Sequence, residues 1–184
     1  MPAHPNSISS IRSFLLLLLS LLALAGLVGC GAANETEVNE GEPLELGDLS
    51  FNVQITRFLN PSSTEDAAYL ENAPALATGQ QYLAIFMQVD NKGDAANVVP
   101  FPFKIIDTRG DIYVQAGVEN GFALAPGAPV EPGESLPGPE TAARTGPIQG
   151  SMILFTIPET ATENRPLQLQ VPGPGEVGEI ELDL

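Results

Sequence analysis

Cys30 is the residue whose type and position indicate the most specific chemistry in this sequence. It follows Leu27-Val28-Gly29 at the end of an apolar run. A branched apolar residue, a second small or branched residue, glycine and then cysteine form the lipobox that lipoprotein signal peptidase reads. There the cysteine thiol is first joined to diacylglycerol, the bond between Gly29 and Cys30 is cut, and the freed amine can then be acylated, for example with palmitate. The spacing therefore predicts a lipid anchor on Cys30.

The segment before Cys30 has the composition of a secretory leader. Arg12 supplies positive charge, no acidic residue precedes Cys30, and an apolar run from Phe14 to Val28 is broken only by Ser20 and Gly26. As a helix this run would span about 22 Å, which is short of the roughly 30 Å hydrocarbon core. We expect a signal peptide over residues 1–29.

Two alternatives for this cysteine are a secretory leader with an accidental cysteine and a buried free thiol. Because Cys30 is the single cysteine of the chain, it cannot form an internal disulfide. Two or three acyl chains give stable membrane anchoring, whereas one gives marginal binding. Lipid on Cys30 is therefore sufficient to place the rest of the chain on the outer face of a cell membrane.

Most enzyme chemistry is excluded by the residue types that follow Cys30. The one histidine is His4 in the leader, and no second cysteine exists. This removes Ser-His-Asp and Cys-His nucleophiles, thiol redox chemistry and His-ligated zinc. Paired carboxylates such as Asp107 and Asp111 could serve a glycoside hydrolase, but neighbours of this kind are expected by chance among 23 acidic residues. We expect no catalytic residue and no cofactor besides the lipid.

Calcium is the remaining chemical alternative. Residues 90–94 read Asp-Asn-Lys-Gly-Asp, which places hard oxygen ligands around a glycine, as Ca²⁺ favours. The stretch lacks the spacing and the distant glutamate of an EF-hand, and the same residue types suit a β-turn. We expect a plain turn and keep Asp90 and Asp94 as candidate calcium ligands.

The charge distribution bears on the choice of partners. All 23 Asp and Glu but only six of the seven Lys and Arg follow the leader, so residues 30–184 carry a net charge of −17. Nucleic-acid binding draws on clustered Lys and Arg, and it is excluded because the six that follow the leader are few and not clustered. An anionic lipid surface would also repel the domain. A cationic partner or a divalent metal is electrostatically compatible, and solubility alone also explains such acidity.

The elements that follow indicate an all-β domain. Residues 31–43 are polar and acidic, and we expect residues 30–43 to form a flexible tether that holds a domain at 44–184 off the membrane. Residues 81–89 are apolar on both parities, as in a central strand. The other expected strands are Phe51-Val53-Ile55, Phe101-Phe103-Ile105, 112–114, 148–157, Leu167-Leu169-Val171 and Ile180-Leu182-Leu184.

Three features interrupt this pattern. Residues 63–70 (Ser-Thr-Glu-Asp-Ala-Ala-Tyr-Leu) have the signals of a short helix in the first inter-strand crossing. Phe58 and Leu59 break the alternation of the first strand and indicate a bulge. Pro100 and Pro102 predict a sheet edge over 98–107, and the Pro- and Gly-dense stretch 125–147 is expected to be mostly loop. Together the elements predict an immunoglobulin-like antiparallel β-sandwich.

Four pieces of the sequence together look familiar: residues 82–91, 103–110, Pro132-Gly133-Glu134 and 152–155. In these pieces the chain resembles the telokin-like, immunoglobulin-fold domain of unknown function found in secreted proteins and lipoproteins of Gram-positive bacteria. Three further pieces look more specifically like uncharacterised actinobacterial lipoproteins: the long insertion with the expected helix, Gly146-Pro147-Ile148-Gln149-Gly150 and Asn164-Arg165-Pro166-Leu167. The resemblance covers roughly residues 45–184 and implies a fold and a compartment, but no catalytic residues.

We therefore expect a membrane-anchored, extracytoplasmic lipoprotein that is not an enzyme and acts as a protein-interaction or envelope structural module. The 98–107 edge and the 125–147 loop are the expected contact regions for an envelope protein. The alternative is an accessory ligand- or Ca²⁺-binding lipoprotein that serves a transporter.

Overall fold

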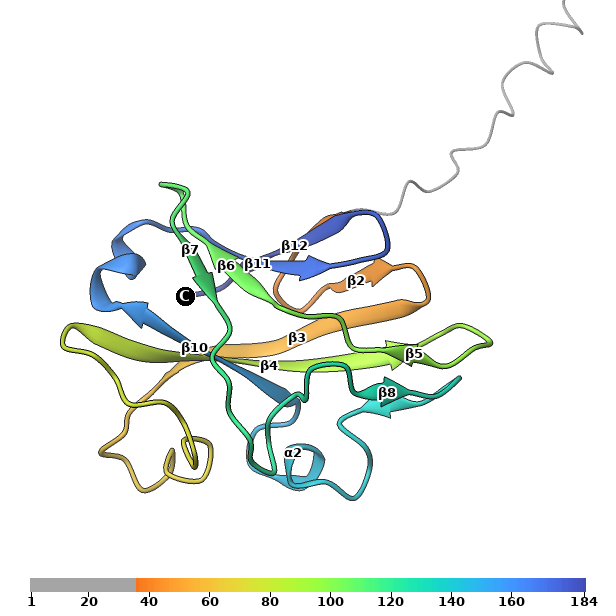
Figure 1. Ribbon diagram of the computed structural model, residues 1–184, viewed down its shortest axis with the longest axis horizontal. Coiled ribbons are helices and arrows are strands. Elements are labelled where there is room, and N and C mark those ends of the chain that lie inside the picture. The colour runs from red at the N-terminus through yellow and green to blue at the C-terminus, as the bar shows by residue number, and fades with distance from the viewer. Residues whose placement is uncertain (1–35) are drawn as a thin grey trace, which may run out of the picture. The chain divides into compact units, whose positions relative to one another are not determined.

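Short β-strands joined by turns account for most of residues 36–184, the part of the chain that the computed structural model describes (Figure 1). These described residues belong to one compact unit. The expected signal peptide, the cleavage site and Cys30 lie outside the described residues. Within residues 36–184, no helix is both long and apolar enough to span a membrane.

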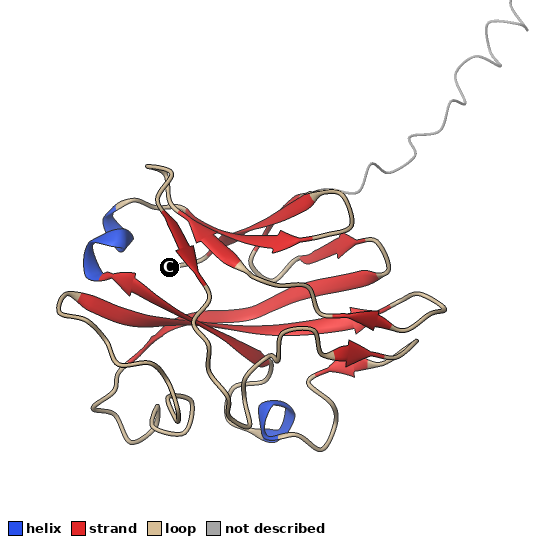
Figure 2. Ribbon diagram, in the orientation of Figure 1, coloured by secondary structure: helices blue, strands red, loops and turns tan. Residues whose placement is uncertain are grey.

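The strands form two main sheets that pack face to face (Figure 2). One has the order β1-β12-β11-β6-β7, the other has the order β10-β4-β3-β2 with β9 beside β4, and β5 pairs with β8. The elements are β1 (Glu37–Asn39), β2 (Pro43–Leu46), β3 (Leu49–Leu59), β4 (Gln80–Asn91), β5 (Asn97–Val98), β6 (Lys104–Ile106), β7 (Ile112–Val114), β8 (Pro129–Val130), β9 (Ser135–Leu136), α2 (Ala142–Thr145), β10 (Ser151–Pro158), the 3₁₀-helix η1 (Glu159–Glu163), β11 (Leu167–Pro172) and β12 (Val177–Leu182).

The predicted immunoglobulin-like β-sandwich is confirmed. All pairings between named strands are antiparallel except that of β1 with β12, which is parallel. The strand order β12-β11-β6-β7 corresponds to the G-F-C-C′ sheet of that fold. Alternation places Leu167, Leu169 and Val171 in the core with no exposed surface, as the sequence predicts. Phe51 and Phe103 meet between the sheets in an edge-to-face contact, with ring centroids 6.5 Å apart.

Strand β4 is buried on both faces, as its continuous apolar sequence predicts. Leu83, Ile85 and Met87 join the core between the sheets. On the other face, Tyr82, Ala84 and Phe86 belong to a second apolar cluster. Loops cover this second cluster, which explains why neither parity of β4 is polar.

The predicted helix over residues 63–70 is wrong. This crossing consists of turns, and the one short α-helix among the described residues is α2. The Asp66 carboxylate accepts a hydrogen bond from Asn60 N (2.8 Å) and pairs with Arg57 (2.5 Å). Because Asp66 is nearly fully buried by these contacts, tertiary pairing outweighs the local helix signals. The stretch 125–147, expected to be mostly loop, contains β8, β9 and α2 as short elements between its loops.

The prediction of a flexible tether that extends to residue 43 is also wrong. Glu37–Asn39 form β1, which pairs with β12 through Val38 opposite Ile180, and β2 begins at Pro43. Val38 is 8% exposed and belongs to the core. A three-residue strand with a single inward apolar side chain shows no periodicity in the sequence, so it was indistinguishable from a polar linker.

Strand β3 contains the predicted bulge, but at a different position. The register shifts between Val53 and Ile55, four residues before Phe58. Because an extra residue exchanges the two faces of a strand, Thr56 becomes buried and Ile55 is 40% exposed. The alternation expected for Phe51, Val53 and Ile55 is therefore interrupted before Ile55.

The predicted edge over 98–107 is only partly correct. Strand β6 lies between β11 and β7 and is not an edge, whereas residues 99–103 form no strand of the main sheets. Phe103 and Ile105 are buried, but Phe101, expected on the same face, is 59% exposed. With prolines on both sides of it, Phe101 lacks ladder pairing to fix its face.

Candidate functional site

The β6–β7 hairpin is held by one buried carboxylate, that of Asp107. Its Oδ1 accepts hydrogen bonds from Arg109 N (2.9 Å) and Asp111 N (3.0 Å). Its Oδ2 accepts them from Tyr113 Oη (3.1 Å) and Asn164 Nδ2 (3.3 Å). Thr108 N and Oγ1 both donate to Asn164 O. These bonds join the hairpin to the segment that precedes β11.

The electrostatics of this cluster follow from burial and hydrogen bonding. Burial raises the pKa of Asp107, but the four hydrogen bonds outweigh it, so that the pKa lies below its ordinary value. Burial and the nearby Asp107 raise the pKa of Tyr113. Every donor that Asp107 faces belongs to the hairpin or to Asn164, so its carboxylate orients a turn. Asp107 and Asp111, the possible acid pair, are joined through the Asp111 backbone.

The hairpin contributes the apolar margin of the solvent-facing side of its sheet. Side chains of β1, β12, β11, β6 and β7 point away from the core in two rows that the strand register aligns. One row contains Glu37, Glu179, Gln170, Lys104 and Val114, and the other contains Asn39, Glu181, Gln168, Ile106 and Ile112. We call these ten residues the outer face.

The outer face changes in character from one margin to the other. The β1–β12 side carries carboxylates, and the glutamines of β11 donate to two of them, Gln168 to Glu37 (3.3 Å) and Gln170 to Glu179 (3.0 Å). At the β7 margin, Ile112 and Val114 are 55% and 52% exposed. Ile112 and Val114 therefore give the β7 margin an exposed apolar character that the carboxylate-bearing side of the outer face lacks.

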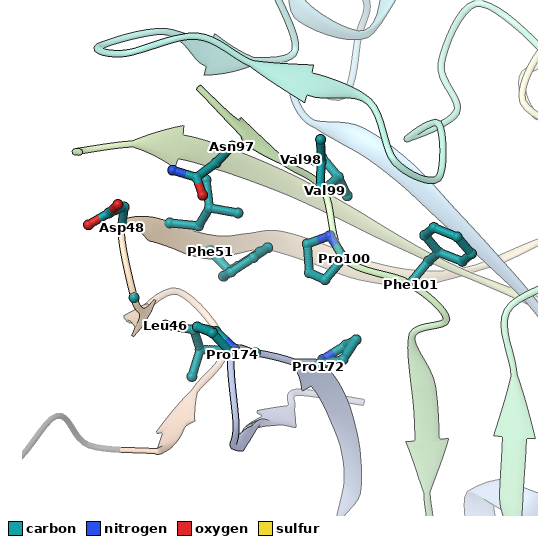
Figure 3. A pocket seen from close by; sticks show the side chains of 13 residues that line it. Leu46, Asp48, Phe51, Asn97, Val98, Val99, Pro100, Phe101, Pro172 and Pro174 are labelled. Atoms are coloured by element: carbon teal, nitrogen blue, oxygen red, sulfur yellow. The ribbon is translucent and has the colours of Figure 1, made fainter. Parts of the chain in front are cut away.

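A second exposed apolar feature is a groove at one end of the sandwich, with a volume of about 580 Å³ (Figure 3). The β2–β3 turn, residues 97–101 and the β11–β12 turn line it. Phe51 and Val99 are fully buried in its lining, whereas Val98 and Phe101 are 60% and 59% exposed. Its polar lining side chains are Asp48 and Asn97.

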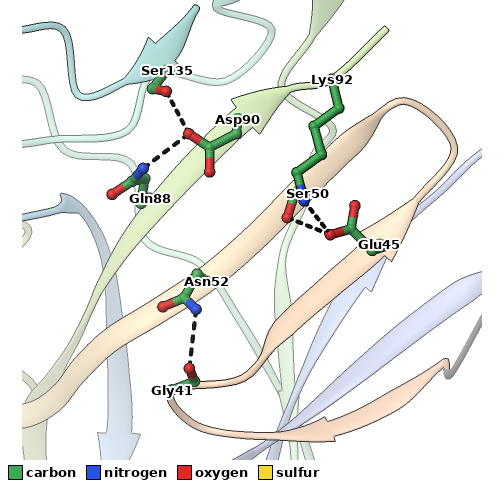
Figure 4. Close-up of polar contacts among 8 residues, drawn as sticks. All are labelled: Gly41, Glu45, Ser50, Asn52, Gln88, Asp90, Lys92 and Ser135. Atoms are coloured by element: carbon green, nitrogen blue, oxygen red, sulfur yellow. Dashed lines mark hydrogen bonds and ion pairs between the residues drawn. The ribbon is translucent and has the colours of Figure 1, made fainter. Parts of the chain in front are cut away.

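The two candidate calcium ligands are not brought together with a third acidic group. Asp90 lies in β4, and its Oδ1 accepts hydrogen bonds from Gln88 Nε2 (2.9 Å) and Ser135 Oγ (Figure 4). Asp94 is exposed in the turn after β4. In the described part of the chain, no group of three or more His, Cys, Asp or Glu side chains is placed to hold a metal ion.

Asn91, the last residue of β4, is buried and holds the turn that follows. Its Nδ2 donates to Ala95 O (2.8 Å) and Val130 O (2.7 Å), and its Oδ1 accepts from Gly93 N (3.0 Å). The amide thus ties the turn to β8. These contacts account for the Asp-Asn-Lys-Gly-Asp sequence by conformation, as the expectation of a plain turn requires.

The sequence located these surfaces incompletely. Part of the groove, Val98 to Phe101, falls in the 98–107 region expected to make contacts. Ile112 and Val114 were expected as strand residues, but their exposure follows from pairing with β6, which the sequence does not give. The contribution of Pro172 and Pro174 depends on the β11–β12 turn reaching the β2–β3 turn, where Pro174 packs on Gly47.

Comparison with known proteins finds similarity of fold only. No family model matches the chain, and no curated protein matches it. An uncharacterised β-sandwich protein from Clostridium difficile 630 is 14% identical, with 81% of this chain and 95% of that chain covered and a TM-score of 0.49. The secreted protein MPT63 from Mycobacterium tuberculosis is also 14% identical, with 83% and 100% covered and a TM-score of 0.49. The yjhA protein from Bacillus subtilis is 13% identical, with 79% and 98% covered and a TM-score of 0.49.

Proposed function

We propose that this chain is a lipid-anchored, extracytoplasmic and non-enzymatic module that contacts an envelope protein through its outer face. The anchor rests on the lipobox Leu27-Val28-Gly29-Cys30. The observation that carries the contact role is the exposed apolar margin, Ile112 and Val114, beside the polar rows of the outer face.

The arrangement of charge supports a defined class of partner. The β1–β12 side of the outer face contains Glu37, Glu179 and Glu181, while Lys104 lies near the apolar margin. A partner surface with basic residues opposite the glutamates and apolar residues opposite β7 would be complementary. Sandwich domains commonly use such sheet faces for recognition.

The chemistry of the site supports a role without catalysis. The Asp107 carboxylate is directed at donors of the hairpin that it supports. From Cys30 onward the sequence contains no histidine, and its one thiol is that of Cys30. A binding module needs neither group, because its affinity comes from surface complementarity.

Cross-linking on intact cells tests this proposal. The native chain, a variant with Ile112→Ser and Val114→Ser, and a control with Val98→Ser would be cross-linked and purified under denaturing conditions. We expect one or a few envelope proteins to be enriched with the native chain and with the control. The double variant is expected to lose at least about fivefold of this enrichment, because two apolar contacts are removed.

The control separates a specific face from general stickiness. Val98 is as exposed as Ile112 but lies in the groove. If no protein is enriched with the native chain, or if the double variant retains every partner, the proposed contact through the outer face is wrong.

A further inference from the structure

The first described strand begins at the end of the sandwich that carries the groove. Glu179 N donates to Thr36 O (2.7 Å), and from there β1 runs parallel to β12. The start of β1 therefore lies beside the start of β12. The same end of β12 follows the turn whose residues Pro172 and Pro174 line the groove (Figure 3).

The number of residues between Thr36 and Cys30 limits the distance of this end from a membrane. Six residue steps span at most about 22 Å when fully extended. A lipid on Cys30 would therefore keep the groove end, and not the β6–β7 hairpin end, close to the bilayer. This is a shorter connection than a flexible tether through residue 43 would provide.

The shape and lining of the groove suit a hydrocarbon chain. Apolar side chains and prolines supply most of its surface, with Phe51 and Val99 buried at its base and Val98 and Phe101 at its exposed margin. Its volume of about 580 Å³ is in the range of pockets that bind small ligands and gives room for a single long acyl chain. A lipid acyl chain that enters the groove from an adjacent bilayer does not have to cross water. It therefore avoids the unfavourable free energy of exposing its apolar surface to water.

The charge at the groove selects among lipid headgroups. Asp48 is its one charged lining residue, and Gly93 packs so closely against Asp48 that a Cβ there would lie 2.5 Å from its Cγ. The neighbouring Lys92 does not neutralise Asp48, because its Nζ lies 2.5 Å from Glu45 (Figure 4). A carboxylate in this position repels anionic headgroups and free fatty acids, and it attracts an ammonium group.

We propose that the groove holds one acyl chain of a zwitterionic, amine-bearing lipid. This lipid belongs to the membrane to which the protein is anchored. This inference rests on the anchoring part of the proposed function. It assigns a lipid-binding role to an end of the sandwich that is distinct from the outer face.

The test uses the mature lipidated protein reconstituted in phosphatidylcholine vesicles. The vesicles contain phosphatidylethanolamine with a photoreactive diazirine in one acyl chain, and the labelled peptides are mapped by mass spectrometry. We expect label within residues 46–51, 97–101 or 172–174. Phe101→Ser is expected to reduce this label at least about fivefold, because the ring forms part of the groove margin. Phe58→Ser is the control, because it makes the same substitution at an exposed phenylalanine near the other end of β3. It should leave the label in the groove unchanged.

Several results would overturn the proposal. Label absent from the groove of vesicle-bound protein would mean that no membrane lipid enters it, for example because the acyl chain of Cys30 itself or a second copy of the protein occupies it. Equal labelling by diazirine-bearing phosphatidylglycerol would contradict the assigned lipid class. If the protein carries no lipid and fails to join vesicles, the anchoring proposal itself fails. The two failures are therefore distinguishable. Thermal unfolding of both variants, and a second groove variant, Val98→Ser, guard against loss of fold.

Discussion

Asp107 shows how a buried acid in this chain serves structure. It accepts two backbone and two side-chain hydrogen bonds that fix the β6–β7 turn and join it to Asn164. Hydrogen bonds to a charged acceptor are among the stronger ones in proteins. The orientation of the apolar margin of the outer face therefore depends on a residue that is not itself part of that face.

Replacing Asp107 by Asn tests this role. The amide retains an acceptor for Arg109 N and Asp111 N but presents a donor to Asn164. We expect a loss of about 1–3 kcal/mol in the free energy of unfolding at pH 7, measured by urea denaturation.

The pH dependence of the same variant follows from the lowered pKa of Asp107. A folded-state pKa below the unfolded one stabilises the fold above the unfolded pKa, and this contribution is lost as the pH falls through the folded pKa. The difference in unfolding free energy between the native chain and Asp107→Asn should therefore narrow below about pH 4. A difference that is constant from pH 7 to pH 3 would contradict the assignment.

At the scale of elements, the contact between β10 and β4 depends on a glycine. Gly150, directly before β10, has φ of +127°, and a Cβ there would lie 2.9 Å from Met87 N. Gly150→Ala should therefore destabilise the fold by about 2–4 kcal/mol, seen as a lower midpoint of thermal unfolding. Gly117→Ala is the matched control, because nothing lies within 4 Å of its Cβ position. Equal effects of the two substitutions would exclude the close approach.

Strand β1 gives a second prediction at this scale. Val38 is 8% exposed and packs in the core, whereas Val177 on β12 is 53% exposed. Val38→Ala should lower the free energy of unfolding by about 1–2 kcal/mol, and Val177→Ala by less than about 0.5 kcal/mol. Urea denaturation of both variants measures the difference. If Val38→Ala is also neutral, β1 contributes nothing to the fold.

The sequence predicts the long elements better than the short ones. β4, β10, β11 and β12 follow from apolar runs or strict alternation, because burial of several side chains per strand leaves a periodic pattern. β1 leaves no such pattern, and the crossing at 63–70 has helix signals that the pairing of the buried Asp66 with the partly exposed Arg57 overrides. The conformation of both segments depends on pairing with residues distant in the sequence. A local sequence pattern carries no information about such pairing.

The candidate surfaces were predictable to a smaller extent. The prolines near Val98 and Phe101 indicate their exposure, because proline disfavours regular strand pairing. The outer face required the register of β6 with β11 and of β6 with β7, and the groove required three separate turns to meet. Both are properties of topology.

At the scale of the whole molecule, the sandwich presents two distinct surfaces, and the lipid that we propose on Cys30 would determine which of them faces the membrane. The groove lies at the end where β1 begins, and the outer face extends from β1 across to β7. The module would thus meet the membrane at one end and present its sheet face to the side. Removal of the lipid should separate the protein from the membrane without changing its fold.

Cys30→Ser tests this separation. Without the thiol no diacylglycerol can be attached, and a polypeptide without an acyl chain or a transmembrane segment lacks a stable anchor. We expect the variant to move from the membrane fraction to the soluble extracytoplasmic fraction or the medium, or to remain as uncleaved precursor. Its circular dichroism should match that of the native domain. Cleaved variant that stays in the membrane fraction would show that something other than lipid retains it.

The proposed anchor is tested by the intact mass of the protein extracted from its own membranes, together with sequencing of its first peptide. We expect a protein that begins at Cys30 and carries diacylglycerol on the thiol, with or without an acyl group on the amine. A chain that still begins at Met1, or a Cys30 with a free thiol, would contradict it.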